Sequence, residues 1–74
     1  MAFPLIRQLY QDLNKALDDF RREGLISSKE YEELTEKLHK IYSNGFNSYI
    51  KISKMTEILE ELVKKEFRRR VMLQ

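Results

Sequence analysis

Four kinds of side chain in this sequence could do chemistry: one histidine, an aspartate pair, a run of glutamates and a basic cluster. His39 is the only histidine and cysteine is absent, so neither a histidine cluster nor a thiolate metal site is available. Asp18 and Asp19 are adjacent and point in different directions on a helix, which does not suit a metal site. The glutamates of "EYEEL" precede lysines by one turn, as on a solvated helix face. We therefore expect a non-enzymatic protein with no catalytic, cofactor-binding or metal-binding residue.

The basic cluster lies near the end of the sequence and consists of Lys64, Lys65, Arg68, Arg69 and Arg70. Such residues contact nucleic-acid phosphates, an acidic protein or only water, and they also offset the negative end of a helix macrodipole. No segment gathers Arg, Asn or Gln at a helix start for base readout, and the aromatic signatures of RNA-binding domains are absent. Any nucleic acid bound by these five residues would be held through its phosphates, with a strong dependence on salt.

Length and composition limit the architecture. The 74 residues carry a formal net charge of +2 and are expected to form one domain over 1–74. Domains below roughly 70 to 80 residues usually need a disulfide, a metal or oligomerisation, and only oligomerisation or partner binding suits this composition. No apolar run approaches the roughly 18 residues of a membrane span, and "MAFPLIRQL" lacks the pattern of a signal peptide. We expect a cytoplasmic protein that does not bind membranes or a small-molecule substrate.

The apolar spacing predicts an all-α fold that begins with a helix over about 4–23. Pro4 suits the first turn of a helix, and Gly24 follows the last periodic residue, where glycine commonly ends a helix. The apolar residues fall within an arc of about 140° on a helical wheel. They are Leu5, Ile6, Leu9, Tyr10, Leu13, Ala16, Leu17 and Phe20.

A second helix is predicted over about 28–43. The stretch "SSKE" suits a capping box that begins at Ser27, and Ser28 is an alternative cap. The helix is expected to end at Asn44 and Gly45, which are residues able to take a positive φ. Its apolar face consists of Tyr31, Leu34, Leu38, Ile41 and Tyr42.

The third helix is predicted to be the longest, over about 48–71, and its start is either near Ser48 or at Ser53. "SYIKIS" alternates like a strand, but no other segment offers a partner strand, so we favour helix. Its expected core face comprises Ile52, Met55, Ile58, Leu59, Leu62 and Val63. The three segments predict a small three-helix bundle, or a hairpin with a longer projecting third helix.

An apolar line continues past this core face at Val63, Phe67 and Val71, with a spacing of four residues. Two explanations are open. Met1, Phe3 or the curvature of the bundle shields the line, or it is an uncovered ridge that a second copy or another protein buries.

Tyrosines are frequent and suit core positions from which the hydroxyl reaches water. Tyr42, Phe46 and Tyr49 surround the expected turn at Asn44 and Gly45, and could instead form an exposed aromatic cluster. This cluster is a second candidate contact surface.

The segment "LDDFRREGLISSKEYEELTEKLHKIY", from Leu17 to Tyr42, resembles the short helical hairpin called SHOCT. The resemblance implies a hairpin that oligomerises or contacts proteins and has no catalytic activity. A further likeness, at "TEKLH" over 35–39, is to the Spo0E-like phosphatases of sporulation signalling. The catalytic Asp of that family would fall on His39, so the likeness implies docking on a signalling protein without phosphatase activity.

Taken together, the sequence predicts a small regulator, adaptor or inhibitor of phage or mobile-element type that binds another protein, with a homodimer as one form. The expected partner-binding residues are Val63, Lys64, Phe67, Arg68, Arg69 and Val71. Phe67 and Val71 would be the apolar anchors, and Lys64, Arg68 and Arg69 the charged rim. The alternative is a nucleic-acid-binding regulator that uses the basic cluster.

Overall fold

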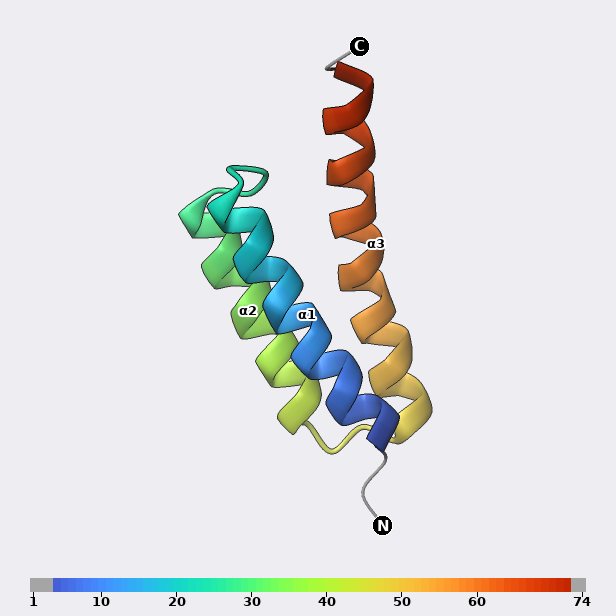
Figure 1. The fold of residues 1–74 in the computed structure, drawn as a ribbon. Helices are drawn as coiled ribbons and strands as arrows, with labels where there is room; N and C mark the ends of the chain where they lie inside the picture. The colour runs from blue at the N-terminus through green and yellow to red at the C-terminus, as the bar shows by residue number, and fades with distance from the viewer. Residues whose placement is uncertain (1–3, 73–74) are drawn as a thin grey trace.

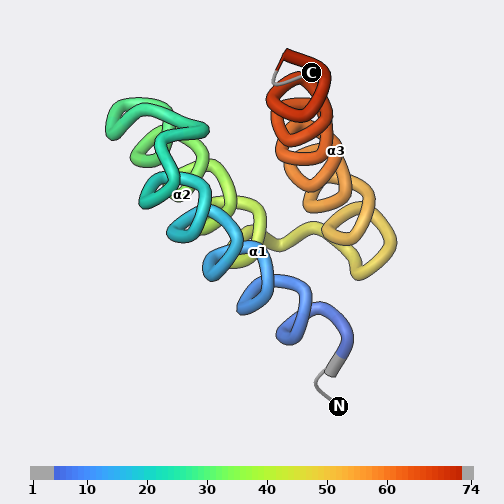
Figure 2. The backbone as a smooth tube through the Cα atoms, turned by 45° about the horizontal axis from the view of Figure 1, so that its top comes forward, coloured from blue at the N-terminus to red at the C-terminus, as the bar shows by residue number. Residues whose placement is uncertain are grey.

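Residues 4–72 are described by the computed structural model, and they form three helices: α1 (Pro4–Arg22), α2 (Ser28–Ser43) and α3 (Ser48–Met72). Helices α1 and α2 form an antiparallel hairpin (Figure 1). Helix α3 starts beside the first turns of α1, and its axis diverges from the hairpin toward its C-terminal end (Figures 1 and 2). The predicted all-α fold is confirmed over the described residues: each helix contacts the other two as in a small bundle, and α3 is the longest. The molecule measures 46 × 21 × 15 Å.

Helix α1 ends in the glycine cap that the sequence predicts. Gly24 has a φ of 75°. The backbone N–H of Leu25 donates to the carbonyl of Phe20 at 2.9 Å, and the N–H of Gly24 donates to the carbonyl of Arg21 at 3.1 Å. These two bonds form a Schellman motif, which pairs carbonyls that the helix end would leave without partners.

Helix α2 begins with the capping box expected at Ser27, which settles the choice between Ser27 and Ser28. The backbone N–H of Glu30 donates to Ser27 Oγ at 3.0 Å, and the backbone N–H of Ser27 donates to Glu30 Oε1 at 3.3 Å. The connection between α1 and α2 is therefore fixed by local hydrogen bonds at both of its ends.

The turn between α2 and α3 differs from the prediction. Neither Asn44 nor Gly45 takes a positive φ, and Asn44 is extended at φ −74° and ψ 159°. Asn44 Oδ1 instead accepts from the N–H of Phe46 at 3.1 Å, and Asn47 Oδ1 accepts from the N–H of Ile50 at 2.9 Å. Side-chain amides thus replace left-handed backbone here, and α3 begins at Ser48, the earlier of the two predicted starts.

The core is a narrow strip along the facing sides of the helices. Its buried residues are Ile6, Leu13, Leu17, Ile26, Leu38, Ile41, Met55, Ile58 and Leu62. Three residues predicted to be in the core are exposed: Leu5, Leu59 and Val63. Leu5 precedes buried Ile6 and points about 100° away from it, and Leu59 and Val63 are offset in the same way from Ile58 and Leu62. The hairpin covers only one side of α3, so the offset brings Leu59 and Val63 to the surface.

Candidate functional site

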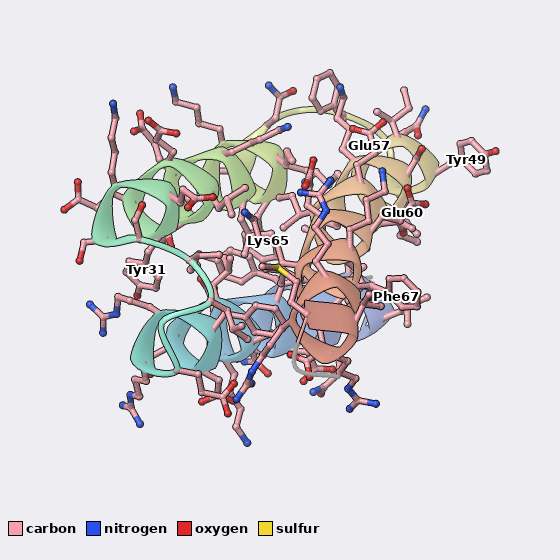
Figure 3. The ribbon with its side chains drawn as sticks, turned by 90° about the horizontal axis from the view of Figure 1, so that it is seen from above. Tyr31, Tyr49, Glu57, Glu60, Lys65 and Phe67 are labelled. Atoms are coloured by element: carbon pink, nitrogen blue, oxygen red, sulfur yellow. The ribbon has the colours of Figure 1, made fainter. Side chains whose placement is uncertain are left out.

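The main candidate site is an exposed line of apolar side chains on α3, which we call the α3 ridge: Leu59, Val63, Phe67 and Val71. The exposed fractions of these residues are 41%, 58%, 67% and 55%, whereas neighbouring Leu62 is 1% exposed. The spacing of four residues places them in one row along the helix. Phe67 projects away from the hairpin, on the same side of α3 as Tyr49 and Glu60 (Figure 3).

A shallow apolar groove of about 380 Å³ runs beside the α3 ridge, between α1 and α3. Ala16 and Phe20 form its wall on α1, and Leu62, Val63 and Phe67 contribute from α3. Its rim carries Glu66 and Arg70. The groove has room for an apolar side chain from another molecule, so the ridge and the groove together offer both a projection and a recess.

The curvature of the bundle does not shield this surface, because Val63, Phe67 and Val71 each remain more than half exposed. Met1 and Phe3, the other side chains expected to shield Phe67, lie outside the described residues. Within the part of the chain that the structure describes, the uncovered ridge is the arrangement observed.

The basic cluster does not act as one group, because three of its five members are ion-paired. Lys65 Nζ lies 2.8 Å from Glu30 Oε2, and Arg69 Nη1 lies 3.7 Å from Glu23 Oε2. Both pairs join α3 to the end of the hairpin where α1 meets α2, and Lys65 points toward the hairpin in Figure 3. Arg70 Nε donates to Glu66 Oε1 at 3.2 Å within α3.

Lys64 and Arg68 form no ion pair with another residue in 4–72, and both are exposed. They lie one residue beyond Val63 and Phe67, so they border the α3 ridge. The predicted site residues therefore separate into two sets. Val63, Lys64, Phe67, Arg68 and Val71 share a free surface, whereas Arg69 belongs to the contact with the hairpin.

Glu60 is a neighbour of the α3 ridge that the sequence interpretation missed. It occupies the same row as Lys64 and Arg68, at a spacing of four residues, and projects on the same side as Phe67 (Figure 3). Glu60 also has no ion-pair partner among residues 4–72. The row therefore begins with an acidic residue and ends with basic ones. The regular spacing of "EELVKKEFR", residues 60–68, was the signal available in the sequence.

Glu30 combines a helix cap with an ion pair, and this combination changes its acidity. The hydrogen bond from Lys65 and the backbone N–H of Ser27 both favour the charged carboxylate, and they lower the pKa of Glu30 below its ordinary value of 4.5. The group links the start of α2 to the C-terminal half of α3, and so helps to set the direction of α3.

The exposed aromatic cluster predicted around the second turn does not form. The ring of Tyr42 stacks on that of Tyr10, with centroids 4.1 Å apart and an interplanar angle of 16°. The Tyr10 hydroxyl lies 3.3 Å from His39 Nδ1, which gives His39 a structural partner. Tyr49 is 82% exposed and stands apart from this stack. Tyr42 is drawn into packing because α1 and α2 lie side by side at this level.

The remaining acidic side chains of the described residues are ion-paired or stand apart from one another. Asp18 pairs with Arg21 at 2.8 Å and with Arg22 at 2.9 Å. Residues 4–72 contain no group of three or more His, Cys, Asp or Glu side chains that could hold a metal ion. Among the described helices, none combines the length and the apolar character needed to cross a membrane.

None of the family models, curated proteins or solved structures with which the sequence was compared matches it. The resemblances to the SHOCT hairpin and to the Spo0E-like proteins therefore stay predictions. The α3 ridge and its flanking charges are the features on which a functional proposal has to rest.

Proposed function

We propose that this protein is a small, non-enzymatic regulator or adaptor that acts in the cytoplasm by binding protein through the α3 ridge. The observation that carries the proposal is the exposure of Val63, Phe67 and Val71 along one face of α3. Apolar side chains in a continuous exposed row favour association, because burying them removes apolar surface from water.

Phe67 is the proposed central anchor. It is the largest side chain of the ridge and borders the groove beside α1. Buried aromatic anchors carry much of the binding energy in protein interfaces, and charged residues at the rim set orientation and association rate. We assign the rim to Lys64 and Arg68, and we remove Arg69 from it because Arg69 lies 3.7 Å from Glu23.

The second candidate function is binding of nucleic-acid phosphates. It is favoured by the exposed Lys64 and Arg68, which have no ion-pair partner among residues 4–72. Lys65, Arg69 and Arg70 would have to leave carboxylate partners before they contacted a phosphate. Two free cations make a weak phosphate site, so we rank this candidate below protein binding.

Affinity capture from lysate of the protein's own organism, with and without nuclease, distinguishes the two candidates. Retained proteins are identified by mass spectrometry, and binding is then measured with the purified partner. We expect retention to survive nuclease and Phe67→Ala to weaken binding by about 30-fold or more, the ~2 kcal/mol that defines a hot spot.

Tyr49→Ala is the matched control, because Tyr49 is also an exposed aromatic residue on α3 but lies at the opposite end of the helix. Equal binding by Phe67→Ala and wild type would contradict the proposed anchor. Loss of all retained material with nuclease, together with loss of binding in the Arg68→Gln, Arg69→Gln, Arg70→Gln triple variant, would establish the nucleic-acid alternative instead.

A further inference from the structure

We propose that the occupant of the α3 ridge is a second copy of this chain, packed antiparallel to the first about a two-fold axis. This inference rests on the proposed function and names the partner of the same surface. It is carried by two features of α3: the symmetry of its apolar row and the order of charges beside that row.

The apolar row is self-complementary when it is reversed. An axis that passes midway between Val63 and Phe67 places Val63 of each copy opposite Phe67 of the other. The same axis places Leu59 opposite Val71 at both ends of the contact. A two-fold interface of this kind uses one surface patch twice, and rows of residues four apart are the rows that pack into each other's grooves in helix pairs.

The order of charges selects the antiparallel direction. Glu60 comes before Lys64 and Arg68 in the row that borders the ridge. With this axis, Glu60 of each copy lies on the same flank as Arg68 of the other and about 3 Å from it along the helix, so two attractive contacts form. The two Lys64 side chains lie between these contacts, near the axis. In a parallel two-fold pair, the charged rows of the two copies would lie on opposite flanks of the contact, so Glu60 of one copy could not reach Arg68 of the other. Glu60 and Arg68 have no ion-pair partner among residues 4–72, so pairing across the dimer does not require them to leave one.

The size of the chain favours the same conclusion. A narrow core supports this domain, and the chain has no cysteine with which to staple it. Oligomerisation is a common source of stability for domains of this length. The ridge runs from Leu59 to Val71, and twelve steps of 1.5 Å give it a length of about 18 Å, which suits a small interface. We therefore expect a dissociation constant on the order of micromolar and a dimer that exchanges readily.

Charge reversal tests the arrangement on the full-length protein. Sedimentation velocity over a concentration series at low salt is compared for wild type, Glu60→Lys, Arg68→Glu and the double variant. We expect each single reversal to raise the dimer dissociation constant by about tenfold or more, because both cross-copy contacts become repulsive. The double variant exchanges the two signs, restores both contacts and should dimerise like wild type.

Matched controls are Glu32→Lys and Lys29→Glu, which reverse exposed charges on α2 and should leave the dimer unchanged. Circular dichroism of every variant shows whether the helices are retained, since the altered side chains are exposed. In a parallel dimer the charged rows of the two copies do not meet, so neither single reversal would turn an attractive contact between Glu60 and Arg68 into a repulsive one. Single variants that dimerise like wild type would therefore overturn the antiparallel arrangement.

A wild-type protein that stays monomeric throughout the series would overturn the dimer itself. The proposed function is tested separately, by the dependence of capture on Phe67. A monomer that still captures a different protein through Phe67 refutes the second copy as occupant but keeps the interaction function. A monomer whose capture does not depend on Phe67 refutes both.

Discussion

Leu62 and Phe67 lie close together on α3, yet they have opposite surroundings. Leu62 is 1% exposed and belongs to the core, whereas Phe67 is 67% exposed. We expect Leu62→Ala to lower the free energy of unfolding by about 2–5 kcal/mol, through lost burial and the cavity it leaves. Phe67→Ala should change the free energy of unfolding of the isolated chain by less than about 0.5 kcal/mol. Urea denaturation in dilute solution measures both values.

A loss of several kcal/mol in Phe67→Ala under dilute conditions would show that Phe67 packs within its own chain. Val63→Ala provides an independent check, because Val63 is exposed in the same row. The two ridge variants should behave alike in denaturation, and both should differ from Leu62→Ala.

The lowered pKa of Glu30 predicts how the stability of the protein changes in acid. Because the pKa of Glu30 is lower in the folded chain than its ordinary value of 4.5, its stabilising contribution is present above pH 4.5. That contribution is lost as the pH falls through the lowered folded-state pKa. We therefore expect wild type to lose stability on acidification below pH 4.5 more steeply than Glu30→Gln, and to be more stable than this variant at neutral pH.

Thermal unfolding midpoints measured across this pH range test the expectation. Glu32→Gln is the control, since Glu32 is exposed on the same helix and has no ion pair among the described residues. Parallel acid profiles for wild type and Glu30→Gln would show that the contact with Lys65 does not persist in solution.

At the scale of the elements, the two glycines make a matched pair. Gly24 has a φ of 75° in the Schellman motif, whereas Gly45 does not have a positive φ. A Cβ added at either position would meet no atom within 4 Å. Gly24→Ala should therefore lower the free energy of unfolding by about 1–2 kcal/mol through backbone strain alone. Gly45→Ala should leave it unchanged or raise it by up to about 1 kcal/mol.

Chemical denaturation of both variants measures this difference. Equal stabilities for Gly24→Ala and Gly45→Ala would contradict the left-handed conformation at Gly24. Because neither position is crowded, packing offers no alternative explanation for a difference between them.

Helix boundaries were predictable from the sequence where a local signal fixes them. The capping box of Ser27 and Glu30 and the glycine cap at Gly24 depend on residues within one turn, so both could be read directly. The position of the turn between α2 and α3 was predicted, but the side-chain hydrogen bonds that form it were not. Asn44 is able either to take a positive φ or to accept a hydrogen bond with its side chain, and its residue type does not decide between them.

The exposed part of α3 was harder to predict. A helical wheel groups Leu59 and Val63 with Leu62, but only the direction from which the hairpin approaches decides which of them is buried. The ion pairs of the basic cluster also depend on how the helices pack, which the sequence pattern of α3 does not show. Lys65 and Arg69 are paired with Glu30 and Glu23, which are distant in the sequence and become neighbours only when α3 returns alongside the hairpin.

At the scale of the whole molecule, α3 is held unevenly along its length. Its first half carries the buried residues Met55 and Ile58, whereas its last turns are exposed and contact the hairpin through ion pairs. Hydrogen exchange should therefore be slow in the amides of residues 55–62 and faster in those of 66–72. Lys65→Gln should accelerate exchange in 66–72 while leaving 55–62 nearly unchanged.

Hydrogen-exchange mass spectrometry resolves these two segments. Uniform protection along the whole of α3 in dilute protein would show that the last turns are held by more than the two ion pairs. Protection of 66–72 that increases with protein concentration would instead reflect burial of the α3 ridge by a second copy.

The most direct test of the account is hydroxyl-radical labelling of Phe67, read out by mass spectrometry in the dilute free protein and in the complex retained by affinity capture. The account predicts strong labelling of Phe67 in the free protein and protection in the complex, while Tyr49 is labelled in both. Equal labelling of Phe67 in the two states, or protection already present in the dilute free protein, would contradict the α3 ridge as the binding surface.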